Sequence, residues 1–140
     1  MAISAALFIT CLSVSVAEAS APRVVLNNRP LVFDVDPFIM EDRVMVPMRT
    51  IFEALGAEVE WNPESRSVTA RSGGETVFLS IDSRTAFRYS SSETGTVPVD
   101  LDPPPIILGD RTIVPLRFVS ESLKAAVRWD GSTGTVYITK

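Results

Sequence analysis

Few side chains in this sequence have the chemistry of a catalytic group. The 140 residues include no histidine, and the one cysteine is Cys11. Serine–histidine and cysteine–histidine pairs are therefore excluded, as are zinc or copper sites built on histidine and cysteine ligands. Among the 17 acidic residues, two carboxylates would have to share a pocket to work as in glycosidases. We expect a non-enzyme without metal or cofactor, with a carboxylate-dependent hydrolase as the less favoured alternative.

Two arginines are candidates for ligand contact. Arg49 precedes Glu53 by four residues, and Arg117 precedes Glu121 by four. On a helix this spacing brings the two side chains of each pair together on one face. A structural ion pair is the first interpretation of each arginine, and a clamp for a ligand is the second.

Two tryptophans are the other candidates. Trp61 follows Val59 by two residues, and Trp129 follows Val127 by two. Alternate residues of a strand share a face, so each tryptophan is expected beside its valine. Packing in the core is the first interpretation, and a stacking platform for a sugar ring is the second.

The charge balance argues against a nucleic-acid partner. The chain has 13 basic and 17 acidic residues, a net charge of −4. Removal of a leader that contains Glu18 leaves a net charge of −3. Nucleic acids are bound through clustered Lys and Arg, and this composition has no such excess.

The first residues resemble a secretory leader. Ala5 to Ala17 is almost wholly apolar, and Ala17-Glu18-Ala19 places small residues at the two positions that a signal peptidase reads. We expect residues 1–19 to be a signal peptide, which would remove Cys11 and make the mature protein secreted, with no membrane span. The alternative is an uncleaved anchor, although about 17 apolar residues are marginal for crossing a bilayer.

The rest of the chain contains one pattern twice. A shift of 68 residues aligns Pro30–Ala70 with Pro98–Ile138 without a gap, and 15 of the 41 aligned positions are identical. The clearest block is Asp-Arg-x-x-Val-Pro-x-Arg, which starts at Asp42 and again at Asp110. This agreement indicates an internal duplication.

Each copy is expected to contain the same elements. We assign repeat one to about 24–71, a connecting strand to about 76–82 and repeat two to about 85–140. Each repeat is predicted to hold a β-hairpin, a short strand, one helix after a proline, and a closing hairpin. Met48, Ile51, Phe52 and Leu55 give the first helix an apolar stripe. The predicted fold is α+β, two tandem repeats with helices packed on small antiparallel sheets.

These residues resemble a known family. The block from Asp42 to Arg49, followed by Glu53 to Trp61, and its second occurrence from Asp110 to Trp129, are similar to the copper amine oxidase N-terminal-like (stalk) domain of bacterial secreted and surface proteins. The resemblance covers residues 24–140. It implies an extracellular module that is an appendage of the oxidase and not its catalytic core.

The resemblance and the composition together favour a binding or spacing role. The expected partner is cell-wall polymer or another exported protein, with contacts through the candidate arginines and tryptophans. A purely structural module that self-associates through a sheet edge is the alternative. The sequence does not predict the oligomeric state.

Overall fold

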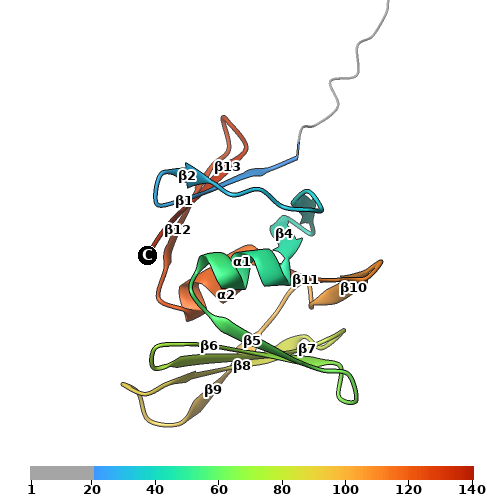
Figure 1. The fold of residues 1–140 in the computed structure, drawn as a ribbon, viewed down its shortest axis with the longest axis vertical. Coiled ribbons are helices and arrows are strands. Elements are labelled where there is room, and N and C mark those ends of the chain that lie inside the picture. The colour runs from blue at the N-terminus through green and yellow to red at the C-terminus, as the bar shows by residue number, and fades with distance from the viewer. Residues whose placement is uncertain (1–20) are drawn as a thin grey trace, which may run out of the picture.

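The computed structural model describes residues 21–140, and the predicted signal peptide lies outside them. Of these residues, 50% are in strands and 12% in helices. The two helices lie side by side in the middle of Figure 1, with one sheet above them and another below.

Three sheets contain the strands of the described region. Sheet A has the order β12-β13-β1-β2, formed by Ala126–Asp130, Thr135–Thr139, Arg23–Leu26 and Arg29–Pro30. Sheet B has the order β10-β11-β4-β3, formed by Ile106–Leu108, Arg111–Pro115, Arg43–Pro47 and Phe38–Met40. Sheet C has the order β5-β6-β7-β8-β9, formed by Glu58–Asn62, Ser67–Ser72, Glu75–Ser80, Thr85–Ser90 and Thr96–Asp100. The helices are α1, Met48–Ala54, and α2, Leu116–Ser122.

The predicted α+β fold with a helix on a small sheet in each repeat is wrong. The protein is mostly β, and its outer sheets combine strands from both copies. In sheet A, β1 pairs in parallel with β13 from the other end of the chain. In sheet C, β7 joins the hairpin β5-β6 to the hairpin β8-β9. A hairpin alone has two unpaired edges, and here each hairpin gains a strand from outside its own copy along one of them.

Sheet B joins the two copies at equivalent positions. Its middle strands β4 and β11 are antiparallel, and Val46 lies opposite Val114, its equivalent after the shift of 68 residues. Met45 lies opposite Pro115 on one side of this pair, and Pro47 lies opposite Ile113 on the other. The pairing therefore places corresponding residues around a local two-fold axis.

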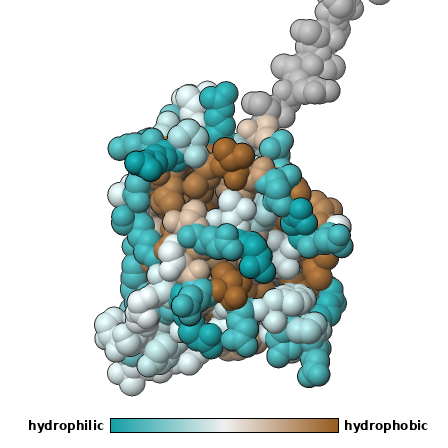
Figure 2. All heavy atoms as spheres, in the orientation of Figure 1, coloured by the Kyte–Doolittle hydropathy of each residue, from teal (hydrophilic) through white to brown (hydrophobic). Residues whose placement is uncertain are grey.

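A shared hydrophobic core lies between the sheets. The predicted helical stripe is confirmed, because Met48, Ile51, Phe52 and Leu55 are all buried. The second helix buries Leu116 and Val119 in the same cluster, together with residues of β6, β7 and β13. Figure 2 shows hydrophobic residues gathered between the upper and lower sheets, with hydrophilic residues around them.

The two helices end in the same way despite a change of residue. Gly56 follows α1 with φ of +76°, and Lys124 follows α2 with φ of +66°. Glycine enters this left-handed region freely, whereas a residue with a Cβ atom is strained there. The lysine therefore carries a local conformational cost that the glycine does not.

Replacing Lys124 by glycine is expected to stabilise the protein. The relief of backbone strain should raise the free energy of unfolding by about 1 kcal/mol. The lost ion pair, Lys124 Nζ to Glu93 Oε1 at 3.6 Å, is exposed and offsets little of this. Urea denaturation measures the change. Gly56→Lys is the matched control and should lower stability by a similar amount; a loss of stability in Lys124→Gly would contradict the explanation.

Candidate functional site

Two clefts open on the surface, and the duplication relates them. Cleft 1 has a volume of about 790 Å³ and cleft 2 of about 510 Å³. Cleft 1 is lined by Ile39, Asp42, Arg43, Asp102, Arg117 and Trp129, among others. Cleft 2 is lined by their equivalents Ile107, Asp110, Arg111, Asp34, Arg49 and Trp61. Nine of the ten residues that line cleft 2 have their equivalent in cleft 1, and seven of these nine pairs are identical.

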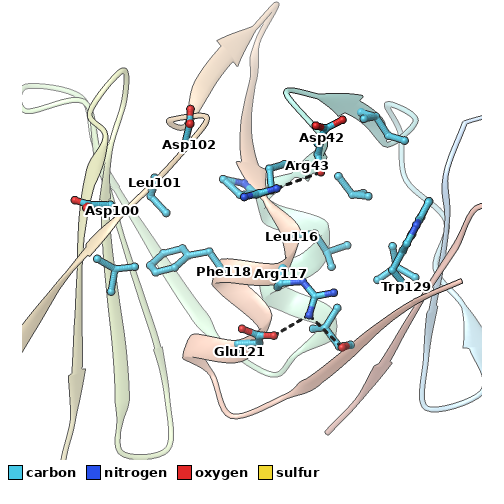
Figure 3. Close-up of a pocket in the computed structure, with 16 residues that line it drawn as sticks. Asp42, Arg43, Asp100, Leu101, Asp102, Leu116, Arg117, Phe118, Glu121 and Trp129 are labelled. Carbon is cyan, nitrogen blue, oxygen red and sulfur yellow. Dashed lines mark hydrogen bonds and ion pairs between the residues drawn. The ribbon is translucent and has the colours of Figure 1, made fainter. Parts of the chain in front are cut away.

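Each cleft contains residues from both copies. The pairing of β4 with β11 places the start of one copy's Asp-Arg block beside the helix of the other copy. In cleft 1, Asp42 and Arg43 from β4 and its preceding turn face Arg117 and Trp129 from α2 and β12 (Figure 3). The site therefore exists only when the two copies are assembled.

The four predicted contact residues separate into two sites. Arg117 and Trp129 line cleft 1, whereas Arg49 and Trp61 line cleft 2. Trp61 is partly buried against the core, in agreement with the packing interpretation. Trp129 is 42% exposed, so much of its ring is available to a ligand.

Both arginines form the predicted ion pair, with different geometry. Arg117 Nη1 lies 3.0 Å from Glu121 Oε1 and also donates to the Val127 carbonyl oxygen at 3.3 Å (Figure 3). Arg49 Nη1 lies 3.7 Å from Glu53 Oε1, beyond hydrogen-bond length. Both pairs are more than half exposed, so each is worth at most about 1 kcal/mol. Arg117 is fixed across the cleft floor, between α2 and β12.

A second arginine–aspartate contact differs between the clefts. In cleft 2, Arg111 Nε donates to Asp34 Oδ2 at 2.6 Å and so joins the two copies. The equivalent residues in cleft 1 are Arg43 and Asp102, but Asp102 Oδ1 instead accepts from Arg84 Nη1 at 2.6 Å. Arg43 donates only to the main-chain oxygen of Asp42, at 3.4 Å, and no salt bridge holds it within residues 21–140.

Comparison with known proteins identifies the family. The chain matches the family described as copper amine oxidase N-terminal domain over residues 25–138. This chain belongs to the copper amine oxidase N-terminal domain family. The resemblance seen in the sequence is thereby confirmed, and it covers nearly all of the described residues.

A relative of this copper amine oxidase N-terminal domain carries a functional name. A protein from Brevibacillus choshinensis named "Protease inhibitor" is 29% identical over 97 residues. The match spans 69% of this chain but 28% of the relative, so the chain corresponds to only part of that protein. Within residues 21–140 no helix is long and apolar enough to cross a membrane.

The described part of the domain also lacks a clustered set of metal ligands. No group of three or more Asp, Glu, His or Cys side chains within residues 21–140 is arranged to hold a metal ion. Two of the acids that line cleft 1 pair with arginines, Asp102 with Arg84 and Glu121 with Arg117.

Sequence reasoning missed several cleft residues. Ile39 is 55% exposed in β3, and Phe118 of α2 points toward sheet C in Figure 3. Arg43 was noted only as part of the repeated block. The sequence held one signal, the identity of Ile39 with Ile107, but their exposure is known only from the structure.

Carboxyl titration in cleft 1 is expected to depend on Arg84. The Arg84 hydrogen bond is the main cause that lowers the pKa of Asp102 below 3.8, and contact with the Asp102 carboxylate raises the pKa of Glu41 above 4.5. In Arg84→Gln, the pKa of Asp102 should rise, and the pKa of Glu41 should rise further because a nearby positive charge is lost. NMR titration of the carboxyl carbons measures both values.

Arg84→Gln is also expected to change how the stability of the protein depends on pH. Because folding lowers the pKa of Asp102, its contribution is present above pH 3.8 and disappears as the pH falls through the folded-state value. Glu41 has the opposite sign, with a contribution that is lost as the pH rises through its raised pKa. Arg66→Gln, which removes the exposed pair with Asp82, is the control. An unchanged pKa of Asp102 in Arg84→Gln would contradict the assignment.

Proposed function

We propose that this protein is a non-catalytic binding module that acts outside the cytoplasm and holds its ligand in cleft 1. The observation that carries the proposal is the distribution of identical residues between the two copies. Of the 15 identical pairs, seven line the clefts. Packing explains the buried identities, such as Val46 with Val114, but does not require the exposed ones.

The exposed identities have the character of binding residues. Ile39 and Trp129 line cleft 1 and are 55% and 42% exposed, so they contribute little to the core. Exposed aromatic and apolar groups with nearby charges are typical of binding surfaces. The volume of cleft 1 falls in the range of known ligand sites, and the cleft is larger than its counterpart.

A non-catalytic role agrees with the side chains available. The sequence has no histidine, and its thiol lies in the predicted leader. The acids Glu41 and Asp102 have shifted pKa values, but both are exposed and Asp102 is paired with Arg84. An exposed paired carboxylate lacks the desolvated environment that prepares a general acid.

The partner is a cell-wall polymer or an exported protein. The predicted leader and the family support a place outside the cytoplasm. The name of the Brevibacillus choshinensis relative supports a protein as partner, because an inhibitor of a protease binds a protein. Inhibition itself belongs to that longer protein and is a second candidate function for this one.

The test is retention of the folded protein by purified cell wall and by exported proteins of the producing organism. Residues 21–140 should be retained by one of these fractions, and Trp129→Ala should reduce retention at least tenfold, because truncation of a central aromatic contact commonly has such an effect. Tyr89→Ala is the matched control, since Tyr89 is 45% exposed but lies outside both clefts. Equal retention of the Trp129 variant, or no retention of the wild type, would contradict the proposal.

A further inference from the structure

The two clefts differ in charge although they share most of their residues. The ionisable side chains that line cleft 1 are Asp42, Arg43, Asp100, Asp102, Arg117 and Glu121, with a net charge of −2. Those of cleft 2 are Asp34, Arg49, Asp110 and Arg111, with a net charge of zero. Part of this difference comes from Glu121, whose identical equivalent Glu53 pairs with Arg49 but does not line cleft 2; Asp100 is the acid that the first copy lacks.

Two of the acids in cleft 1 have no basic partner. Glu121 is paired with Arg117, and Asp102 is paired with Arg84. Within residues 21–140, no salt bridge holds Asp42 or Asp100. Asp100 takes the place of Val32 in the first copy, so this acid is particular to cleft 1. These two carboxylates are available to a positively charged group.

Two aromatic side chains line cleft 1 beside its acids. Trp129 stands on one side of cleft 1 and Phe118 on the other, with Leu116 between them (Figure 3). Phe118 takes the place of Thr50 in the first copy, so cleft 2 lacks this ring. The long aliphatic parts of Lys and Arg pack on such rings while their charged ends reach carboxylates, and a cation over an indole ring gains further attraction.

Among residues 21–140, two strand edges without a partner border the same cleft. β3 is the outer strand of sheet B and supplies Ile39, and β12 is the outer strand of sheet A and supplies Trp129. Outer strands carry main-chain N–H and C=O groups that an extended peptide pairs with in register. A polysaccharide has no repeating amide backbone to match these groups.

We propose that cleft 1 binds an extended, basic segment of a partner polypeptide, with Lys or Arg stems on Trp129 and Phe118 and their charges at Asp42 and Asp100. This inference rests on the proposed function, because it names the ligand class of the same cleft. Cleft 2 lacks equivalents of Asp100 and Phe118, and the ion pair between Arg111 and Asp34 spans it, so we expect it not to bind this segment.

The test is binding of a fluorescein-labelled decapeptide that alternates Lys and Thr, measured by fluorescence anisotropy on residues 21–140. The same peptide with Glu in place of Lys, and oligomers of glucosamine and of N-acetylglucosamine, are the comparison probes. We expect the basic peptide to bind at least tenfold more tightly than any of them. Raising the salt concentration should weaken its binding, because exposed charges are screened.

Substitutions in each cleft show where the basic peptide binds. The double substitution Asp42→Asn with Asp100→Asn should weaken binding of the basic peptide about tenfold, and Trp129→Ala should weaken it by a similar or larger factor. Asp110→Asn and Trp61→Ala alter the equivalent positions of cleft 2 and should have no effect. Circular dichroism of each variant separates loss of binding from loss of fold.

Three other outcomes would overturn part of the proposal. Tighter binding of the acidic peptide or of glucosamine oligomers would overturn the basic polypeptide as ligand while leaving cleft 1 as a binding site. Sensitivity to the cleft 2 variants alone would overturn the choice of cleft. Retention by cell wall or exported proteins, without any binding of the basic peptide, would refute this inference and leave the proposed function standing.

Discussion

Cutting the chain between Gly73 and Gly74 is expected to give two fragments that do not fold alone. The cut lies in the turn between β6 and β7 and changes no buried side chain. The fragment 21–73 loses the partner of β1, which is β13, and the partner of β4, which is β11. What remains is a set of two-stranded hairpins, and such hairpins are marginally stable in water.

Neither fragment alone should retain the fold. A domain of this size is stable by roughly 5–15 kcal/mol, a small difference between large opposing terms. Separating the fragments exposes the shared core, in which Ile51 and Phe52 of one half are fully buried in the same cluster as Val119 and Leu123 of the other. No fragment retains enough buried apolar surface to offset its conformational entropy.

Mixing the two fragments should restore the fold. Strands β6 and β7 pair over six residues, and this pairing can re-form between separate chains. Circular dichroism and NMR spectra of each fragment alone and of the mixture measure this, with the uncut residues 21–140 as the control. A cooperative unfolding transition in either fragment alone would show that the copies are independent units, in conflict with sheets A and C.

Phe52→Ala is expected to have the largest effect of any single substitution considered. Phe52 in α1 is the largest of the fully buried side chains among the described residues. Truncating a buried phenylalanine to alanine costs about 3–5 kcal/mol, from lost transfer energy and from the cavity that remains. This is a large part of the total stability, so the midpoint in urea should fall sharply. Tyr89→Ala, at a 45% exposed position, is the control and should change stability by far less.

The position of Phe52 also shows how the copies diverged inside the core. Its equivalent, Ser120, is completely buried, and its Oγ has no hydrogen-bond partner among the residues that the structure describes. One helix therefore supplies an aromatic ring where the other supplies a small hydroxyl. If Phe52→Ala cost no more than Tyr89→Ala, the burial of this ring would not be the source of stability that the structure indicates.

Local elements could be read from the sequence because their causes are local. The first predicted hairpin turns at Asn27 and Asn28, whose φ angles of 47° and 67° are typical of a tight turn, and asparagine tolerates such angles. The helix begins after Pro47 as predicted, and its apolar stripe is buried. Each feature depends on residues within one or two turns of chain, so nearby sequence suffices to predict it.

The candidate site could be predicted in part. Arg117 and Trp129 were identified by type and spacing, and both line cleft 1. Their separation from Arg49 and Trp61 was not predictable, because each cleft is completed by a strand from the other copy. The different exposure of the two tryptophans also depends on neighbours that are distant in sequence.

What the sequence determined by itself was the kind and order of the local elements, the repeated residue pattern, the family and the lack of histidine chemistry. Only the tertiary structure decided which strands lie side by side and which arginine meets which aspartate. The alternation of apolar residues indicates that a strand has a buried face, but it does not predict which strand will pair with it. Arg111 of one Asp-Arg block is therefore paired with Asp34, whereas no salt bridge within residues 21–140 holds its equivalent Arg43, because Asp102 is paired with Arg84.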